Sequence, residues 1–436
     1  MTNQTRRTKY GLNWYFAIEP LVASKTSTHL MLCAEDIPGE NCFLRVPGDI
    51  QDKIFAVGQT DYAGQAVGVI VAESQTIAMN AAKKVQINYS KVDPPVLSLS
   101  EVVDEKLDDR IIEFDSITPK RKKSDIKYKV NGRWELKAQY HFMMETLTCI
   151  VVPKETHLEV YSSTQHPASV QEAISKALGI PAHRVSITVR RLGGGYGAKL
   201  DRANHTSAVC ALAAHLLHRP VRMVLNLETN MEWMGKRLPN LCDYEVGVND
   251  SGGIQYLNAD IYQDNGNAPS KFIAVHSLKH AGNGYDTSTH GYTMFGVLTN
   301  HAWNTFCRAP GSTEHISLME NIMEHIAVTT NKDPVSVRLA NLPKESSLPK
   351  MIDDLLNSSQ YYSRLEQVDD FNMKNRWKKR GLNMSTMTYP FYYRSNFHAH
   401  VSIFASDATV TISHGGVEMG QGINTKVLML QAVQVA

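Results

Sequence analysis

Residues 190–199 read Arg-Arg-Leu-Gly-Gly-Gly-Tyr-Gly-Ala-Lys. A strand-like run, residues 185–189, precedes this stretch, and an Ala-rich segment expected to be helical, residues 203–217, follows it. Glycines allow positive φ and let the backbone approach a ligand with no Cβ in the way. The N-terminus of the following helix would present unpaired N–H groups to an anion. An anion-binding loop and an ordinary strand-to-helix turn both fit this stretch alone.

The composition is that of a globular chain. The 436 residues are 43% hydrophobic and 20% charged, which allows two or three domains with cores of their own. The formal net charge of +2 gives no electrostatic reason to expect a nucleic-acid or membrane partner. No apolar run reaches the roughly 18 residues of a membrane helix, and the N-terminus lacks a signal-peptide core. We therefore expect a cytoplasmic protein.

Neither the cysteines nor the histidine pairs favour a metal site. The six cysteines contain no Cys-x-x-Cys pair, so we expect most of them to be small buried apolar residues: Cys33, Cys42, Cys149, Cys210, Cys242 and Cys307. His398 and His400 would share one face of a strand, and His276 and His280 one face of a helix. Neither pair has a third ligand at a fixed offset, so we expect no directly bound metal.

The hydrophobic pattern predicts alternating strands and helices. Residues 66–72, 75–84 and 85–89 read as strand, helix and strand, with Ser74 as the helix cap, and predict a small α/β domain. Further strands are expected at 134–140, 148–152, 158–162, 185–189 and 221–225, helices at 100–105, 167–178, 203–217 and 316–326, and a hairpin at 398–404 and 409–413. The basic segment 119–125 is interpreted as a solvated linker in preference to an anion site.

A second glycine cluster lies at residues 415–422. Two such clusters from distant parts of the chain could each bring backbone N–H groups against one ligand, which fits a large, multiply anionic cofactor. The chain has no Gly-x-Ser-x-Gly elbow, Walker loop or dinucleotide fingerprint, so acyl transfer, phosphate-loop chemistry and nicotinamide binding have no motif support.

Four motifs together resemble one family. Gln-Tyr-His-Phe-Met-Met-Glu-Thr at 139–146, the glycine loop at 191–199, Cys-Arg-Ala-Pro-Gly at 307–311 and the glycine cluster at 415–422 occur in the order found in the molybdenum hydroxylases. This is the aldehyde oxidase and xanthine dehydrogenase family, and residues 36–40 and 61–68 extend the resemblance toward the N-terminus.

The resemblance implies an α+β fold, with a small α/β hammerhead domain followed by mixed α/β molybdopterin-binding domains. We place the hammerhead at residues 1–115, a linker at 116–130, the first molybdopterin-binding domain at 131–355 and the start of a second at 356–436.

The resemblance also implies site residues and chemistry. Gln139 would lie beside the molybdenum centre, Gly195 and Tyr196 would pack on the molybdenum–molybdopterin cofactor, and Arg308 and Gln421 would contact it. The family hydroxylates an electron-poor carbon with oxygen from water. In full-length relatives, which are expected to be homodimers, electrons leave through 2Fe-2S clusters to FAD.

Three departures from the xanthine dehydrogenases concern the substrate. Leu200 stands where those enzymes have a glutamate, His276 where they have a purine-binding arginine, and Pro310 where they have an aromatic ring. A purine held by charge-assisted hydrogen bonds would lose its partners in such a pocket. The resemblance therefore implies an aldehyde or a neutral heteroaromatic substrate, and disfavours xanthine.

The general-base glutamate of the family would fall beyond Ala436, so we expect no catalytic residue within this chain. We expect a fragment that is inactive alone, with poor solubility caused by the apolar segment 427–435. Three interpretations stay open: part of a working oxidoreductase, an inactive cofactor-binding remnant, and a non-enzymatic interaction domain.

Overall fold

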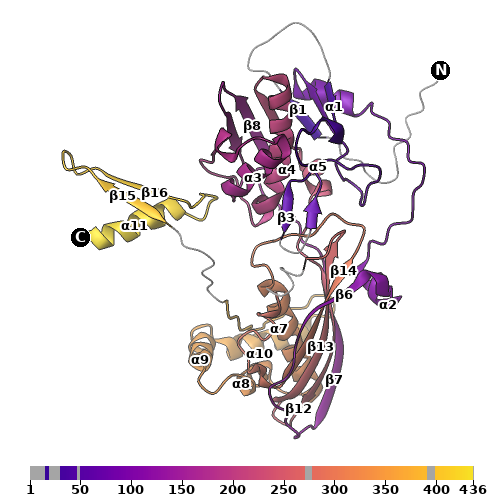
Figure 1. Cartoon of the computed structure of the whole chain (residues 1–436). Helices are drawn as coiled ribbons and strands as arrows, with labels where there is room; N and C mark the ends of the chain where they lie inside the picture. Colours follow the sequence, from indigo (N-terminus) through magenta and orange to yellow (C-terminus); the bar gives the residue numbers. More distant parts are fainter. Residues whose placement is uncertain (1–14, 19–29, 47–49, 271–276, 390–397, 436) are drawn as a thin grey trace.

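The computed structural model describes residues 15–18, 30–46, 50–270, 277–389 and 398–435. Two bodies, each a sheet with helices packed on it, follow one another along the chain, and a hairpin with a helix stands away from them as an arm (Figure 1). The α+β class predicted from the sequence is confirmed.

The first sheet combines strands from two regions of the chain. Its order is β10-β9-β8-β11-β1-β5-β2, with the pairs β9/β10 and β1/β5 parallel and the other neighbours antiparallel. The strands are β1 (Tyr15–Ile18), β2 (Leu30–Leu32), β5 (Val69–Ala72), β8 (Thr148–Pro153), β9 (Leu158–Ser162), β10 (Val185–Thr188) and β11 (Val221–Val224). The N-terminal strands thus continue the sheet that β8 to β11 begin.

The predicted strand–helix–strand unit is only partly correct. Helix α1 (Gln75–Ala82) follows β5, and the Ser74 hydroxyl accepts a hydrogen bond from Ile77 N at 3.3 Å, as predicted. The predicted strand at 85–89 is wrong, because the chain there joins no sheet. Its alternating apolar residues, Val85 and Ile87, pack against α1 instead. The alternation of apolar residues thus correctly indicated which side chains face inward, but among the described residues no strand pairs with the backbone of residues 85–89.

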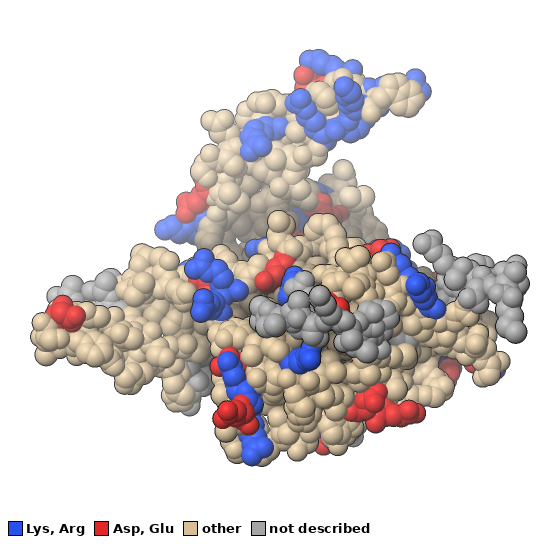
Figure 2. Space-filling view, turned by 90° about the horizontal axis from the view of Figure 1, so that it is seen from above, with Lys and Arg blue, Asp and Glu red and all other residues tan. Residues whose placement is uncertain are grey.

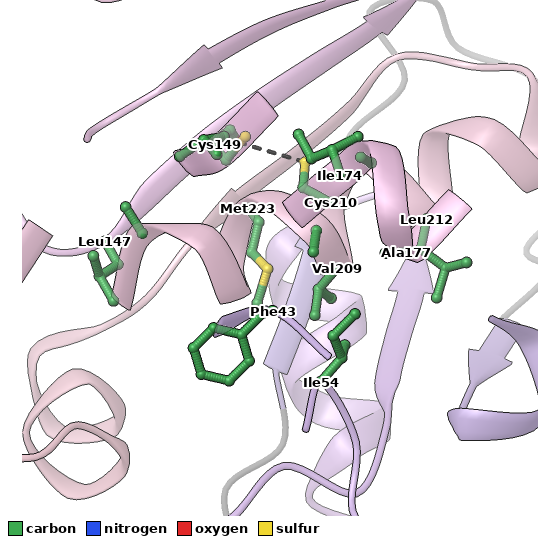
Figure 3. Packing of buried hydrophobic residues seen from close by; sticks show 14 of the residues in the cluster. Phe43, Ile54, Leu147, Cys149, Ile174, Ala177, Val209, Cys210, Leu212 and Met223 are labelled. Atoms are coloured by element: carbon green, nitrogen blue, oxygen red, sulfur yellow. Dashed lines mark hydrogen bonds between the residues drawn. The ribbon is translucent and has the colours of Figure 1, made fainter. Parts of the chain in front are cut away.

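Helix α3 (Pro167–Leu178) ends as predicted, at Gly179 with φ 64°. Helix α4 (Ala198–Leu217) begins at Ala198 and not at Ala203, so Lys199 and Leu200 belong to its first turn and not to the glycine loop. In Figure 3, Val209, Cys210 and Leu212 of α4 lie among Ile174 of α3 and Met223 of β11.

Cysteines contribute to this core as small apolar residues. The Cys210 thiol lies 3.7 Å from Cys149 O in Figure 3, and five of the six cysteines are buried, with Cys33 half-buried. Their predicted role is confirmed for these five.

The second sheet has the order β6-β14-β13-β12-β7. Its strands are β6 (Ile111–Ile117), β7 (Tyr128–Leu136), β12 (Asn240–Val248), β13 (Ile254–Gly266) and β14 (His290–Leu298). Helix α7 (Ser312–Thr330) covers one face and buries Leu318, Met319, Ile322, Met323 and Ile326 there, which confirms that the methionines of this helix are core residues. Strands β12, β13 and β14 were not predicted from the sequence, and the predicted strand at 134–140 extends past Leu136, where β7 ends.

The predicted linker at 116–130 overlaps both β6 and β7, which are the two edge strands of this sheet. The chain between them is fixed at Arg121, whose Nη2 lies 2.6 Å from an Asp286 carboxylate oxygen and whose N donates to Ser288 O at 2.9 Å. The bounds of these four predicted ranges remain predictions.

Shorter elements complete the two bodies. They are β3 (Leu44–Val46), β4 (Ile50–Asp52), α2 (Leu99–Asp104), α5 (Leu227–Trp233), α8 (Pro334–Ala340), α9 (Leu348–Ser358) and α10 (Tyr361–Lys374). Strands β3 and β4 form a two-stranded sheet of their own.

The arm consists of the predicted hairpin, β15 (Ala399–Ile403) and β16 (Val410–His414), and of α11 (Ile423–Val435). Several large apolar side chains of the arm are exposed, among them Ile403 at 61%, Leu428 at 60%, Met429 at 65% and Leu430 at 68%. Contiguous exposed apolar surface favours association with other surfaces.

Figure 2 shows acidic and basic side chains scattered over a mostly uncharged surface, with one predominantly basic group at the top of the view. No helix within the described ranges is both long enough and apolar enough to cross a membrane.

We expect the arm to make the chain self-associate. Replacing Leu428 and Leu430 together with lysine should shift the weight-average mass in sedimentation velocity toward the monomer, because charged side chains resist burial. The matched control replaces Met351 and Leu355 of α9, 61% and 50% exposed, with lysine and should leave the mass unchanged. A wild-type chain that is monomeric at tens of micromolar would contradict the expectation.

Candidate functional site

The glycine loop connects β10 to α4 and depends on positive φ angles. Gly194 has φ 89°, Tyr196 φ 53° and Gly197 φ 99°. Gly197 also allows close contact, because a Cβ there would lie 2.6 Å from Phe306 O. A tyrosine in the left-handed region costs on the order of 1 kcal/mol, and such residues occur preferentially at functional sites. The backbone of the loop therefore requires glycine at positions 194 and 197, and it holds Tyr196 in a strained conformation.

Two side chains hold this loop. One carboxylate oxygen of Glu145 accepts from Gly193 N at 3.0 Å and from Lys199 Nζ at 2.7 Å. Gln165 Oε1 accepts from Gly197 N at 3.1 Å and would lie 2.5 Å from a Cβ on Gly195. The Lys199 side chain is fully buried, whereas Glu145 is 38% exposed, and burial lowers the pKa of Lys199 while the Glu145 carboxylate opposes that change. The loop is thus fixed at both ends before any ligand binds.

The Cys-Arg-Ala-Pro-Gly segment meets the loop directly. Arg308 N donates to Tyr196 O at 2.8 Å. Ala309 and Gly311 have φ 56° and 77°, so this segment also relies on left-handed backbone where it turns into α7. The sequence order of the two motifs gives no sign of this contact, but the family resemblance predicts that both face one cofactor.

Gln139 is connected to the same place through Arg237. Arg237 Nε donates to Gln139 Oε1 at 2.9 Å, and Arg237 Nη2 donates to Arg308 O at 2.7 Å. Gln139, Arg308 and Tyr196, which belong to three different sequence motifs, therefore lie along one hydrogen-bonded path. Arg237 itself was not predicted.

The second glycine cluster also reaches the loop. Leu192 N donates to Glu418 O at 2.8 Å, and Gln165 Nε2 lies 3.4 Å from Met419 Sδ. Among the residues that the structure describes, Gln421 bonds only to its own loop: its Oε1 accepts from Met419 N at 2.7 Å and its Nε2 donates to Val417 O at 2.8 Å. The two glycine clusters thus meet through their backbones, and no hydrogen bond among the described residues brings the Gln421 side chain to Gln139.

Glu418 already shows how the second cluster binds negative charge. Its carboxylate accepts from Gly420 N at 2.9 Å and from Gly422 N at 3.1 Å, and these hydrogen bonds lower the pKa of Glu418. Glycine N–H groups at the start of α11 are therefore arranged as anion donors, as expected at a helix N-terminus.

The predicted substrate-pocket residues are distributed around these segments. Leu200 lies half-buried in the first turn of α4, directly after the loop, and Pro310 lies half-buried two residues after Arg308. His276 falls outside the described residues. Its predicted partner His280 is placed, and its Nδ1 lies 3.4 Å from Ser312 Oγ.

His141 links two segments of the site through a buried hydrogen bond. Its ring Nε2 lies 2.6 Å from Phe306 O, and since a carbonyl only accepts, Nε2 carries the proton. Burial lowers the pKa of His141 to about 4, with the Phe306 hydrogen bond acting in the opposite direction. The side chain is therefore neutral at pH 7 and ties residue 141 to residue 306.

The free donors of the site match an anionic, oxygen-rich group. Within the part of the chain that the structure describes, the N–H groups of Gly194, Gly195 and Tyr196, the Gln139 Nε2 and the Arg308 guanidinium have no hydrogen-bond acceptor or carboxylate partner. All of these groups donate and none accepts. No group of three or more metal-ligating side chains occurs among the described residues.

Family models match most of the chain. Residues 104–342 match the molybdopterin cofactor-binding domain, residues 354–435 match a second model of the same description, and residues 23–93 match the a/b hammerhead domain of aldehyde oxidase and xanthine dehydrogenase.

Full-length relatives are similar over most of this chain. A probable aldehyde oxidase 2 of Oryza sativa subsp. japonica is 34% identical over 430 residues, and an indole-3-acetaldehyde oxidase of Zea mays is 33% identical over 435 residues. Each alignment covers 92% of this chain and 32% of the relative, so the chain spans about a third of their length.

Solved structures share the fold. The aldehyde oxidoreductase from Desulfovibrio gigas superposes with a TM-score of 0.68 at 20% identity, over 79% of this chain and 41% of that one. Quinoline 2-oxidoreductase from Pseudomonas putida 86 gives 0.69 at 18% identity, over 83% and 52%.

Acid should destabilise the chain partly through His141. The native ring stays neutral down to about pH 4, whereas the unfolded ring takes up a proton below its ordinary pKa of 6.5. The stability associated with this difference is complete above pH 6.5 and is lost as the pH falls toward 4; it amounts to about 3 kcal/mol.

Denaturant titrations between pH 7 and pH 4 measure this effect. His141→Gln should show a shallower fall in unfolding free energy than wild type, and a substitution of the exposed His183, His183→Gln, should follow the wild-type curve. Equal curves for all three proteins would show that His141 does not contribute.

Proposed function

Because the chain belongs to the molybdopterin cofactor-binding domain family, we propose that it binds the molybdenum–molybdopterin cofactor between its two glycine clusters, as part of an oxidoreductase that hydroxylates aldehydes with water. The observation that carries the proposal is the hydrogen-bonded path from Gln139 through Arg237 to Arg308 and Tyr196. It joins three motifs of the family at one place and leaves their donors unpaired.

Each part of the site has a role in this proposal. The loop N–H groups and the Arg308 guanidinium would bind anionic oxygens of the cofactor, and the Gln139 amide would donate to an oxygen beside the metal. Gln421 would contact the pterin after its bonds within its own loop rearrange. The cofactor, when bound, supplies the oxygen-transfer and electron-accepting chemistry. The protein would hold and orient it.

The substrate part of the proposal depends on Leu200 and Pro310. Both are half-buried, and both would present apolar surface, which suits an aldehyde or a neutral heteroaromatic ring and leaves a purine without charged partners. Arginine at 276 would change this preference, but the chain has histidine there. The xanthine dehydrogenases that are also similar to the chain, such as that of Emericella nidulans at 29% identity, make xanthine the second candidate, which Leu200 disfavours.

Turnover would need groups that the resemblance assigns elsewhere: a glutamate base, 2Fe-2S clusters and FAD. The proposal for this chain is therefore tested on binding and not on rate.

Cofactor content after expression in a molybdopterin-producing host tests the proposal. We expect purified wild-type chain to carry pterin, detected by fluorescence after oxidation, together with molybdenum in comparable amount. Gly195→Ala should lower pterin content at least about tenfold, because the new Cβ displaces Gln165 and with it the loop.

The matched control is Gly381→Ala, since a Cβ at Gly381 meets nothing within 4 Å. It should retain wild-type pterin content. Wild-type chain that is folded but free of pterin would contradict the proposed function.

A further inference from the structure

Arg237 lies behind Gln139 and is almost completely buried. Its side chain is 4% exposed, and its backbone N donates to Gln139 O at 2.9 Å. The guanidinium bonds to three separate segments: Gln139 Oε1 at 2.9 Å, Arg308 O at 2.7 Å and Glu314 Oε1 at 3.0 Å. Gln139 lies just after β7, Arg308 lies just before α7, and Glu314 lies within α7. One side chain therefore sets the relative position of all three.

We propose that Arg237, held by Glu314, is a positioning residue that fixes the Gln139 amide so that its Nε2 points to the ligand. An arginine only donates, so the amide atom that faces it must be the oxygen. The NH2 group then lies on the other side of the amide, where no described residue accepts from it. The inference rests on the proposed function, because it concerns how Gln139 meets the cofactor.

Lysine could not replace this arginine. The guanidinium is planar and presents several donors in a fixed fork, whereas an ammonium is a point charge on a flexible stem. Three acceptors in three directions, at 2.7 to 3.0 Å, match the fork. A lysine ammonium in the same place would still pair with the Glu314 carboxylate, but it would not hold a hydrogen bond to Gln139 Oε1 in a fixed direction.

Glu314 is the charge partner that makes this burial possible. It is 2% exposed, and its second oxygen, Oε2, has no hydrogen-bond donor among the described residues. Burial raises the pKa of Glu314, and the Arg237 charge opposes that change. Without the carboxylate the guanidinium would be a buried charge with only neutral acceptors, which is strongly unfavourable.

The same helix supplies a matched control. Arg338 Nε lies 2.8 Å from Glu320 Oε2, and the two side chains are 0% and 10% exposed. This pair joins α8 to α7 and makes no hydrogen bond to Gln139, Arg308 or the glycine loop. Arg338→Lys should therefore have a structural cost similar to that of Arg237→Lys without the proposed effect on the site.

The rate of pterin loss from the purified chain tests the proposal in a double-mutant cycle. Arg237→Lys should accelerate loss about tenfold, the usual effect of removing a group that orients a cofactor ligand. Gln139→Ala should do the same, and in the double variant the two effects should combine to less than their product, because Arg237 acts partly through Gln139 and partly through its bond to Arg308 O. Arg338→Lys should lower the melting temperature but leave the rate unchanged. Additive effects, or equal acceleration by Arg338→Lys, would overturn the proposal.

A second measurement needs no cofactor and so separates this inference from the proposed function. In cofactor-free chain labelled with 15N-glutamine, the side-chain amide signal of Gln139 is identified by its loss in Gln139→Ala. We expect its position to move toward that of a free glutamine amide in Arg237→Lys and to stay unchanged in Arg338→Lys. An unchanged signal in Arg237→Lys would refute the positioning role, whether or not wild-type chain carries pterin.

Discussion

A buried guanidinium must find acceptors in every direction in which it donates, and in this chain Arg237 finds them at Gln139 and, about 170 positions later, at Arg308 and Glu314 on either side of the start of α7. Gln139, Arg308 and Glu314 can all accept from it only if two parts of the chain come together: the segment after β7, and the segment that leads into the first turn of α7. The cost of leaving a buried charge unpaired is several kcal/mol, so this requirement selects one arrangement among many. The glycine loop then joins that arrangement through one backbone bond, from Arg308 N to Tyr196 O.

Other hydrogen bonds fix the glycine loop from the opposite side, so the loop is held in place before any ligand is present. Glu145 and Gln165 bind the loop N–H groups at its two ends, and buried Lys199 binds Glu145 from the first turn of α4. The central N–H groups remain free. A site whose donors are held in place by other bonds loses little conformational entropy when an anion binds. The membership of the chain in a cofactor-binding family and this arrangement of donors lead to the same interpretation.

Local features were predictable from the sequence, and contacts between distant residues were not. Pro167 and Gly179 mark the ends of α3 because each acts within one turn of its own position. The strand at 85–89 was wrong because alternation reports which side chains face inward and cannot report whether a partner strand exists. Strands β12 and β13 do alternate, at Cys242, Tyr244 and Val246 for example, and a systematic search for that period would have found them. No pattern in the sequence indicates that Arg237 and Glu314 are buried, because each is buried only as the charge partner of the other, 77 positions away. Gln139, Tyr196 and Arg308 were identified by resemblance, and their roles toward a cofactor remain predictions.

Protein contacts alone assemble and hold the site, and amide hydrogen exchange in the cofactor-free chain can measure this. The informative amides are those of Arg237 and Arg308, which donate to Gln139 O and to Tyr196 O. Both amides should exchange as slowly as those of α4 in the core, as expected of a site assembled before the cofactor binds. Exchange of these two amides at the rate of an unprotected loop, while α4 stays protected, would contradict it.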